Sequence, residues 1–222
     1  MKHYLILFVF CLIISPVFAQ YGWTKAEVTL KSGTILKGEA SLGMMSNGIN
    51  IGKEKLKFRT NKKSKTKKYL PKEIKQAIFT ITYKEKVGRK KIEKTRVEKY
   101  IPIFLNKKQT KLGFVELMVD GDLRLVGRTV AVQSGGWNYG AGAPGAAPVY
   151  LPGFMGSHNQ VMFLKDGEKP KIFNQVSLTK SFRKRAMDYF KDCPKLKNKI
   201  DNKELVKEDL KEIVKFYNSS CN

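Results

Sequence analysis

The alternation of apolar and polar residues predicts a body built from β-strands. The clearest case is Leu56 and Phe58, which alternate with Lys55, Lys57 and Arg59. Similar short runs recur along the chain and are separated by dipeptides that favour tight turns, namely Ser32-Gly33, Asn47-Gly48, Asp120-Gly121 and Asp166-Gly167. The pattern therefore indicates a succession of antiparallel hairpins.

The hydrophobic period changes near the C-terminus. Phe182, Ala186, Tyr189 and Phe190 recur at the spacing of one face of a helix. Pro194 is suited to the first turn of a second short helix, and a third apolar stripe consists of Val206, Leu210, Ile213, Val214 and Tyr217. We therefore predict two or three short helices in residues 177–222.

These patterns together predict a mainly β fold with a helical tail, of the α+β class. Residues 20–176 would form a bent antiparallel sheet, a roll or a partly open barrel. Within them, residues 133–159 are rich in glycine, proline and aromatic residues, which is typical of an exposed functional loop. We expect this segment to be a mobile loop that contacts a partner, with the candidates Trp137, Tyr139, Tyr150 and Phe154.

The first residues have the layout of a cleavable signal peptide. Lys2 precedes an apolar run from residue 4 to residue 14, and Pro16 and Ala19 stand where cleavage requires a breaker and a small residue. The run is shorter than the roughly 20 apolar residues that a spanning helix needs. We therefore expect residues 1–19 to be removed and the protein to be exported, to the periplasm, the outer-membrane periphery or the extracellular space.

The charge of the chain is strongly positive. Lys and Arg number 43 against 19 Asp and Glu, a net charge of +24, and Lys2 is the only charged residue of the predicted signal. Such a charge favours anionic partners, or it serves solubility alone. Basic residues at exposed sheet edges also prevent aggregation. Three tracts are candidates for anion binding: Lys62, Lys63, Lys65, Lys67 and Lys68; Arg89, Lys90 and Lys91; and Arg183, Lys184 and Arg185.

The cysteines predict one disulfide. Cys11 belongs to the signal, which leaves Cys193 and Cys221 as a pair in an oxidising compartment. A bridge between them would reduce the conformational entropy of the unfolded chain and stabilise the fold by about 3.5 kcal/mol. Two free buried thiols are the alternative. Because there is no Cys-x-x-Cys motif, a structural bridge is favoured over a redox pair.

The sequence has no recognisable catalytic or cofactor motif. It lacks a phosphate-binding loop, a dinucleotide fingerprint and zinc-ligand spacing, so we expect neither cofactor nor metal. His158 is the only histidine outside the signal and is more typical of a solvated loop than of a general base. Glu116, Asp120 and Asp122 would share one face if their strand continued through the turn, and could then act in acid–base chemistry. Turn chemistry alone also explains Asp120-Gly121.

Two segments resemble known proteins. The tail, with Tyr189, Phe190, the Asp192-Cys193-Pro194 run and Cys221, resembles the C-terminal segment of uncharacterised exported proteins of Bacteroidota, especially flavobacteria. This resemblance implies a Gram-negative envelope location and no activity. The first hairpin, residues 28–38, is similar to the opening strands of SH3-like or Sm-like barrels, which implies a barrel or roll rather than a flat sandwich.

Three functions are compatible with these observations. We favour a non-enzymatic envelope protein that binds a partner protein or an anionic membrane or glycan surface. The rival is a secreted hydrolase with a site at Glu116, Asp120 and Asp122, which requires these carboxylates to converge in a pocket. A nucleic-acid binder is the least favoured, because export separates the protein from intracellular nucleic acid.

Overall fold

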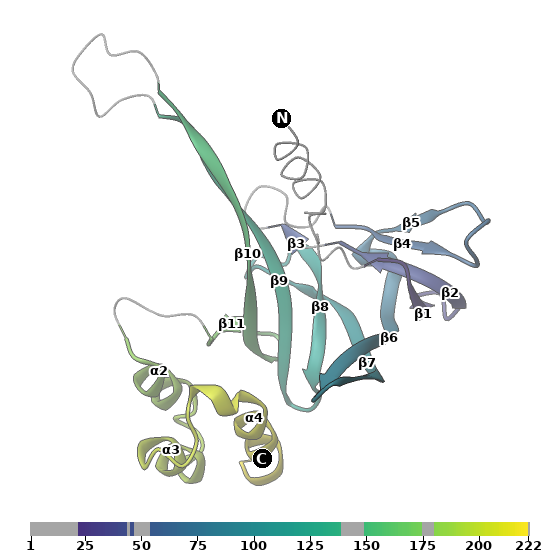
Figure 1. Ribbon diagram of the computed structural model, residues 1–222. Helices are drawn as coiled ribbons and strands as arrows, with labels where there is room; N and C mark the ends of the chain where they lie inside the picture. The colour runs from purple at the N-terminus through teal and green to yellow at the C-terminus, as the bar shows by residue number, and fades with distance from the viewer. Residues whose placement is uncertain (1–21, 44, 47–53, 139–148, 175–179, 222) are drawn as a thin grey trace.

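The computed structural model describes residues 22–43, 45–46, 54–138, 149–174 and 180–221. The predicted signal peptide, the Asn47-Gly48 turn and Tyr139 lie outside these ranges. The described residues form a bent, open antiparallel sheet of ten strands with three short α-helices at its C-terminal end (Figure 1). The predicted fold class is confirmed. No helix of the described ranges is both long enough and apolar enough to cross a membrane.

The sheet is built almost wholly from hairpins between consecutive strands. Its order is β11-β10-β9-β8-β7-β6-β1-β2-β4-β5, and the short β3 pairs in parallel with β9. The strands are β1 (Thr24–Leu30), β2 (Ile35–Leu42), β3 (Met45–Ser46), β4 (Leu56–Arg59), β5 (Lys67–Tyr69), β6 (Ile74–Val87), β7 (Lys90–Phe104), β8 (Leu112–Val119), β9 (Leu123–Asn138), β10 (Val149–Lys165) and β11 (Lys171–Ile172).

Three predicted turns join strands as expected. Gly33, Gly121 and Gly167 have positive φ angles of 88°, 139° and 77°, a backbone region that favours glycine. They lie in the β1–β2, β8–β9 and β10–β11 connections. The local turn chemistry therefore sets these hairpins.

The C-terminal helices are α2 (Phe182–Tyr189), α3 (Pro194–Asp201) and α4 (Leu210–Ser220). Short 3₁₀ turns lie at Pro71–Glu73 (η2) and Lys207–Asp209 (η3). Ser181 caps α2, because its Oγ accepts a hydrogen bond from the Lys184 amide at 3.3 Å. Pro194 occupies the first turn of α3, where its missing amide proton costs nothing.

The helices and the sheet share one apolar core. Phe163 on β10 is fully buried, and its ring centroid lies 4.2 Å from that of Phe173 and 5.5 Å from that of Phe190 on the tail. Leu123 and Leu125 of β9 belong to the same cluster as Leu196, Ile200, Ile213 and Val214 of the helices. Since each helix is short, this common core is what stabilises the tail.

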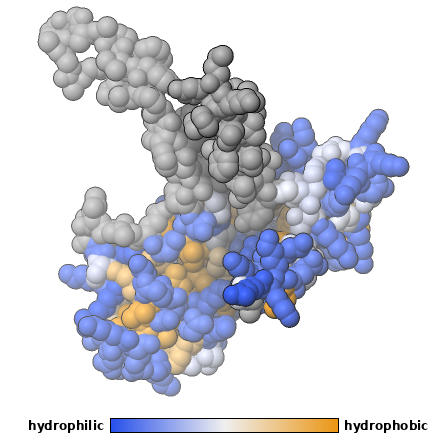
Figure 2. Space-filling view, in the orientation of Figure 1, coloured by the Kyte–Doolittle hydropathy of each residue, from blue (hydrophilic) through white to orange (hydrophobic). Residues whose placement is uncertain are grey.

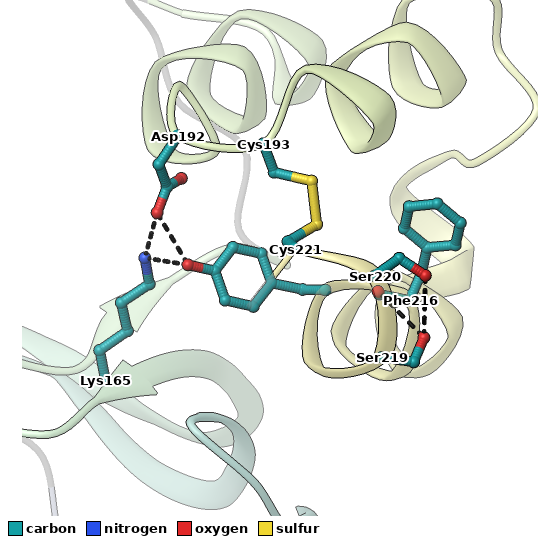
Figure 3. Close-up of a disulfide and its surroundings, with 8 residues drawn as sticks. Lys165, Asp192, Cys193, Phe216, Ser219, Ser220 and Cys221 are labelled. Carbon is teal, nitrogen blue, oxygen red and sulfur yellow. Dashed lines mark hydrogen bonds and ion pairs between the residues drawn. A yellow bond between two sulfur atoms is a disulfide. The ribbon is translucent and has the colours of Figure 1, made fainter.

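Polar contacts beside the disulfide fix the tail to β10 (Figure 3). The predicted Cys193–Cys221 bridge is present and joins the start of α3 to the end of α4. Next to it, Lys165 Nζ donates to Asp192 Oδ2 at 3.0 Å and to Tyr217 Oη at 2.7 Å. Burial lowers the pKa of Lys165, but the hydrogen bonds with Tyr217 and Asp192 outweigh it and leave the pKa raised.

The segment predicted as a mobile loop is mostly paired strand. Residues 133–138 of β9 and 149–159 of β10 continue the antiparallel ladder, and the residues between them lie outside the described ranges. The register shifts once, between Leu151 and Phe154, where Pro152 and Gly153 lie. The prediction was wrong here because ladder hydrogen bonds use backbone groups, so a strong strand pair can extend through a glycine-rich sequence.

Candidate functional site

The first basic tract lies on the β4–β5 hairpin. Lys62, Lys63 and Lys65 are in the turn and Lys67 and Lys68 are on β5, all of them exposed. β5 is the outer strand of the sheet, so these lysines also protect an open edge. Across the described residues, none of the lysines of this tract forms an ion pair. Figure 2 shows the hydrophilic surface of this hairpin at the right of the molecule.

The second tract is at the end of a two-stranded ribbon. β6 and β7 pair with each other from Val87↔Lys90 to Ala77↔Tyr100, whereas β1 pairs with β6 only up to Thr80 and β8 pairs with β7 only from Tyr100. The outer part of this hairpin therefore stands clear of the sheet. At its end, Arg89, Lys90 and Lys91 are exposed, and none of them has an ion-pair partner among the residues that the structure describes.

One face of this ribbon combines apolar and basic side chains. Tyr83 is paired across the strands with Lys94. Ile92 lies two residues before Lys94 on β7, so its side chain is on the same face. Tyr83 is 38% exposed and Ile92 is 45% exposed. The Arg96 guanidinium lies 5.6 Å from the centre of the Tyr83 ring, within the range of a cation–π contact. The ribbon thus has large apolar side chains next to its positive charges.

Two of the three side chains of the third tract bond to other elements of the protein itself. Arg183 Nε donates to Asp201 Oδ1 at 2.9 Å. Arg185 donates to the backbone carbonyls of Ile172 at 3.3 Å and Phe173 at 3.2 Å, which attaches α2 to β11. Lys184 alone of the three points to solvent without such a contact in the described structure. The sequence could not separate these roles, because the partners lie on other elements.

Three of the predicted partner-contact residues, Trp137, Tyr150 and Phe154, lie on a projecting arm. β9 and β10 run far beyond the rest of the sheet (Figure 1). Trp137 and Tyr150 are directly opposite each other in the register, and Phe154 is opposite Ser134. The sequence contains no Asp, Glu, Lys or Arg from residue 129 to residue 164. This absence of charge, in so basic a chain, is a signal that distinguishes the arm.

The three carboxylates of the rival hypothesis do not converge. Asp120 and Asp122 are exposed at the β8–β9 turn, and Asp120 lies 3.7 Å from Lys99 Nζ. Glu116 instead lies in a groove on the sheet. A register shift between Leu117 and Val119 ends the alternation that was expected to align the three residues. The prediction of a site formed by all three carboxylates is therefore wrong, because only Glu116 lies in the groove.

The partner of Glu116 is Glu98, which the sequence analysis did not identify. Tyr100 on β7 is directly opposite Glu116 on β8, and Glu98 precedes Tyr100 by two residues on the same face. Glu98 is only 7% exposed. Arg96 Nε lies 2.8 Å from one of its oxygens, and the Tyr100 hydroxyl donates to the other at 3.2 Å. Strand register alone brings these carboxylates together.

Burial has a direct effect on Glu116. Desolvation raises the pKa of Glu116, and the negative charge of Glu98 raises it further, while Lys211 and Arg96 act in the opposite direction. The groove around it has a volume of about 470 Å³ and lies between strands β7–β10 and Lys211 of α4. In the described ranges, no group of three or more His, Cys, Asp or Glu side chains is placed to hold a metal ion.

Comparisons with known proteins add no relative: no family model, no curated protein and no solved structure matches the chain. The resemblances of the tail and of the first hairpin therefore stay predictions.

Proposed function

We propose that this protein is an exported, non-enzymatic binding protein that attaches to the anionic headgroups of an envelope membrane. The main support for this proposal comes from two of the three basic tracts, which lie at the exposed ends of the β4–β5 and β6–β7 hairpins. Among the described residues, the basic side chains of these two tracts form no ion pairs. The predicted signal peptide supports export, and the Cys193–Cys221 bridge is compatible with it.

The β6–β7 ribbon favours a membrane over other anionic partners. Lysines attract anionic headgroups, and aromatic and aliphatic side chains beside them can enter the boundary between headgroups and acyl chains. Tyr83 and Ile92 meet this requirement, because Lys90 precedes Ile92 by two residues on the same face of the ribbon. Lys94 on that face is ion-paired with Glu85. A purely solubilising charge would not require large apolar side chains at the same exposed face.

The test is co-sedimentation of the mature protein with vesicles made of equal parts phosphatidylglycerol and phosphatidylethanolamine, across a salt series. One variant replaces Arg89, Lys90 and Lys91 with Gln. Because each basic residue near an anionic surface contributes about 1 kcal/mol, we expect a roughly 100-fold weaker binding. The matched control replaces Lys191, Lys195 and Lys215, which are exposed on the helical tail, and should bind as the unmodified protein does.

Binding of the unmodified protein should weaken steeply as salt screens the charges. Equal losses in the ribbon variant and in the control would show that only net charge matters, and would contradict the proposal. Binding that persists at high salt would also contradict it and would direct attention to the uncharged β9–β10 arm.

A further inference from the structure

The groove beside Glu116 is separate from the basic ends of the two hairpins. It lies on the face of the sheet that the helical tail partly covers, at the inner end of the β6–β7 ribbon. Its volume of about 470 Å³ falls within the range of small-ligand sites, about 300–1,000 Å³. Membrane attachment gives this groove no role.

The two carboxylates of the groove differ in their contacts. Glu98 is buried, and both of its oxygens already have partners, Arg96 on one and the Tyr100 hydroxyl on the other. Glu116 is only partly buried and has no hydrogen bond or ion pair among the described residues. Its oxygens are therefore available to a ligand in the groove.

The rest of the lining is mixed in character. Thr129 Oγ1 donates to Asn159 Oδ1 at 2.8 Å, which fixes a hydroxyl and an amide at the rim of the groove. Met118, Val161 and Tyr100 contribute apolar surface. The Met118 side chain lies over Gly127, which is opposite Glu116 in the register, so close that a Cβ at Gly127 would clash with it. Arg128 and Gln160 bond to each other at 2.9 Å and alternate toward the opposite face of the sheet.

This lining selects against charged ligands. The adjacent Glu98 and Glu116 repel phosphate and other anions, whereas Arg96 and Lys211 at the rim disfavour a cation. A neutral ligand with many hydroxyl groups avoids both penalties. Hydroxyls can donate to the free carboxylate and exchange hydrogen bonds with the amide and the threonine, while a carbon face contacts Tyr100 and Met118.

We propose that this groove is a binding site for a neutral saccharide, with Glu116 accepting hydrogen bonds from sugar hydroxyls. Carboxylate, amide and hydroxyl side chains around an apolar floor supply both kinds of contact that a sugar ring makes. The site is independent of the basic hairpins, so it adds a second binding activity to the proposed membrane attachment.

The experiment is a glycan array probed with the labelled mature protein, followed by calorimetric titration with the neutral oligosaccharide that binds most strongly. Glu116→Gln retains the shape of the side chain but replaces one acceptor oxygen with an amide donor, and it should weaken binding at least 10-fold. Asp120→Asn is the matched control, because that carboxylate is exposed at the nearby turn, and it should leave the affinity unchanged.

Three results would overturn the inference. The array could show no neutral saccharide bound, Glu116→Gln could bind as tightly as the unmodified protein, or only acidic glycans could bind and lose affinity when Arg89, Lys90 and Lys91 are replaced. Vesicle binding by Glu116→Gln should stay normal, which separates a failure of the saccharide site from a failure of the membrane proposal.

Discussion

Asn218 offers a direct test of how the helical tail is attached to the sheet. From α4, its Oδ1 accepts a hydrogen bond from the Leu123 amide at 2.9 Å, and its Nδ2 donates to the Leu123 carbonyl at 2.9 Å and to the Asp120 carbonyl at 3.3 Å. The side chain also lies so close to Gly121 that a Cβ at that position would clash with it. The Asn218 amide thus supplies the hydrogen bonds that the backbone of Leu123, at the start of β9, would otherwise need from a neighbouring strand.

Replacing Asn218 with Ala should lower the free energy of unfolding by about 2–4 kcal/mol. Leu123 is fully buried, and loss of the amide leaves both its backbone N–H and its C=O without this partner. Each buried polar group left unsatisfied costs about 1–3 kcal/mol. The free energy is measured by urea denaturation of the oxidised mature protein, which should unfold in one transition because sheet and helices share a core.

Two further variants sharpen this measurement. Asn218→Asp keeps an acceptor for the Leu123 amide. Its protonated form still has one O–H that can donate to a carbonyl, so the loss of stability should be intermediate, whereas the charged form has no donor and should lose more. Ser219→Ala is the control, since Ser219 is exposed and its Oγ bonds within the helix end. A loss for Asn218→Ala no larger than that of Ser219→Ala, about 0.5 kcal/mol or less, would refute the reasoning.

Two other predictions concern the core and the groove. Phe163→Ala should destabilise the protein by about 3–5 kcal/mol in the same assay, because it removes the aromatic contact between β10 and the tail. Phe104→Ala is the control and should cost much less, because Phe104 is exposed. A loss below about 1 kcal/mol for Phe163→Ala would contradict a shared core. For Glu116, the raised pKa means that the folded state binds the proton more tightly than the unfolded chain does, so ionisation destabilises the fold as pH rises through that pKa. Glu116→Gln should therefore be more stable than the unmodified protein at neutral pH. This difference in unfolding free energy should vanish below about pH 4, where the Glu116 carboxyl group is protonated in both the folded and the unfolded state. A difference that does not change with pH would be inconsistent with a desolvated Glu116.

Much of the architecture is present in local sequence patterns. Glycine after Asp120 and Asp166 sets the φ angles of two hairpin turns, and Ser181 caps the first tail helix. Local preferences of this kind act over a few residues and need no tertiary partner. The Cys193–Cys221 pairing followed from counting, because no other cysteine lies outside the predicted signal.

The sites depended on contacts that no local pattern contains. Glu98 and Glu116 meet because Tyr100 pairs with Glu116 in the β7–β8 register, and a one-residue shift would send them to opposite faces. The basic tracts looked alike in sequence, but only folding gave Arg183 and Arg185 partners on α3 and the sheet. Composition likewise suggested a loop at residues 133–159, whereas extension of the β9–β10 ladder made most of it strand.

The sequence by itself thus determined the class of fold, the turns, the helices, the disulfide and the excess of positive charge. Tertiary structure decided which charges remain available to a partner and which side chains share a groove. The reason is physical: dihedral preference and hydrophobic period are properties of neighbouring residues, while strand register and helix docking depend on how the whole chain satisfies its buried backbone groups and apolar surface.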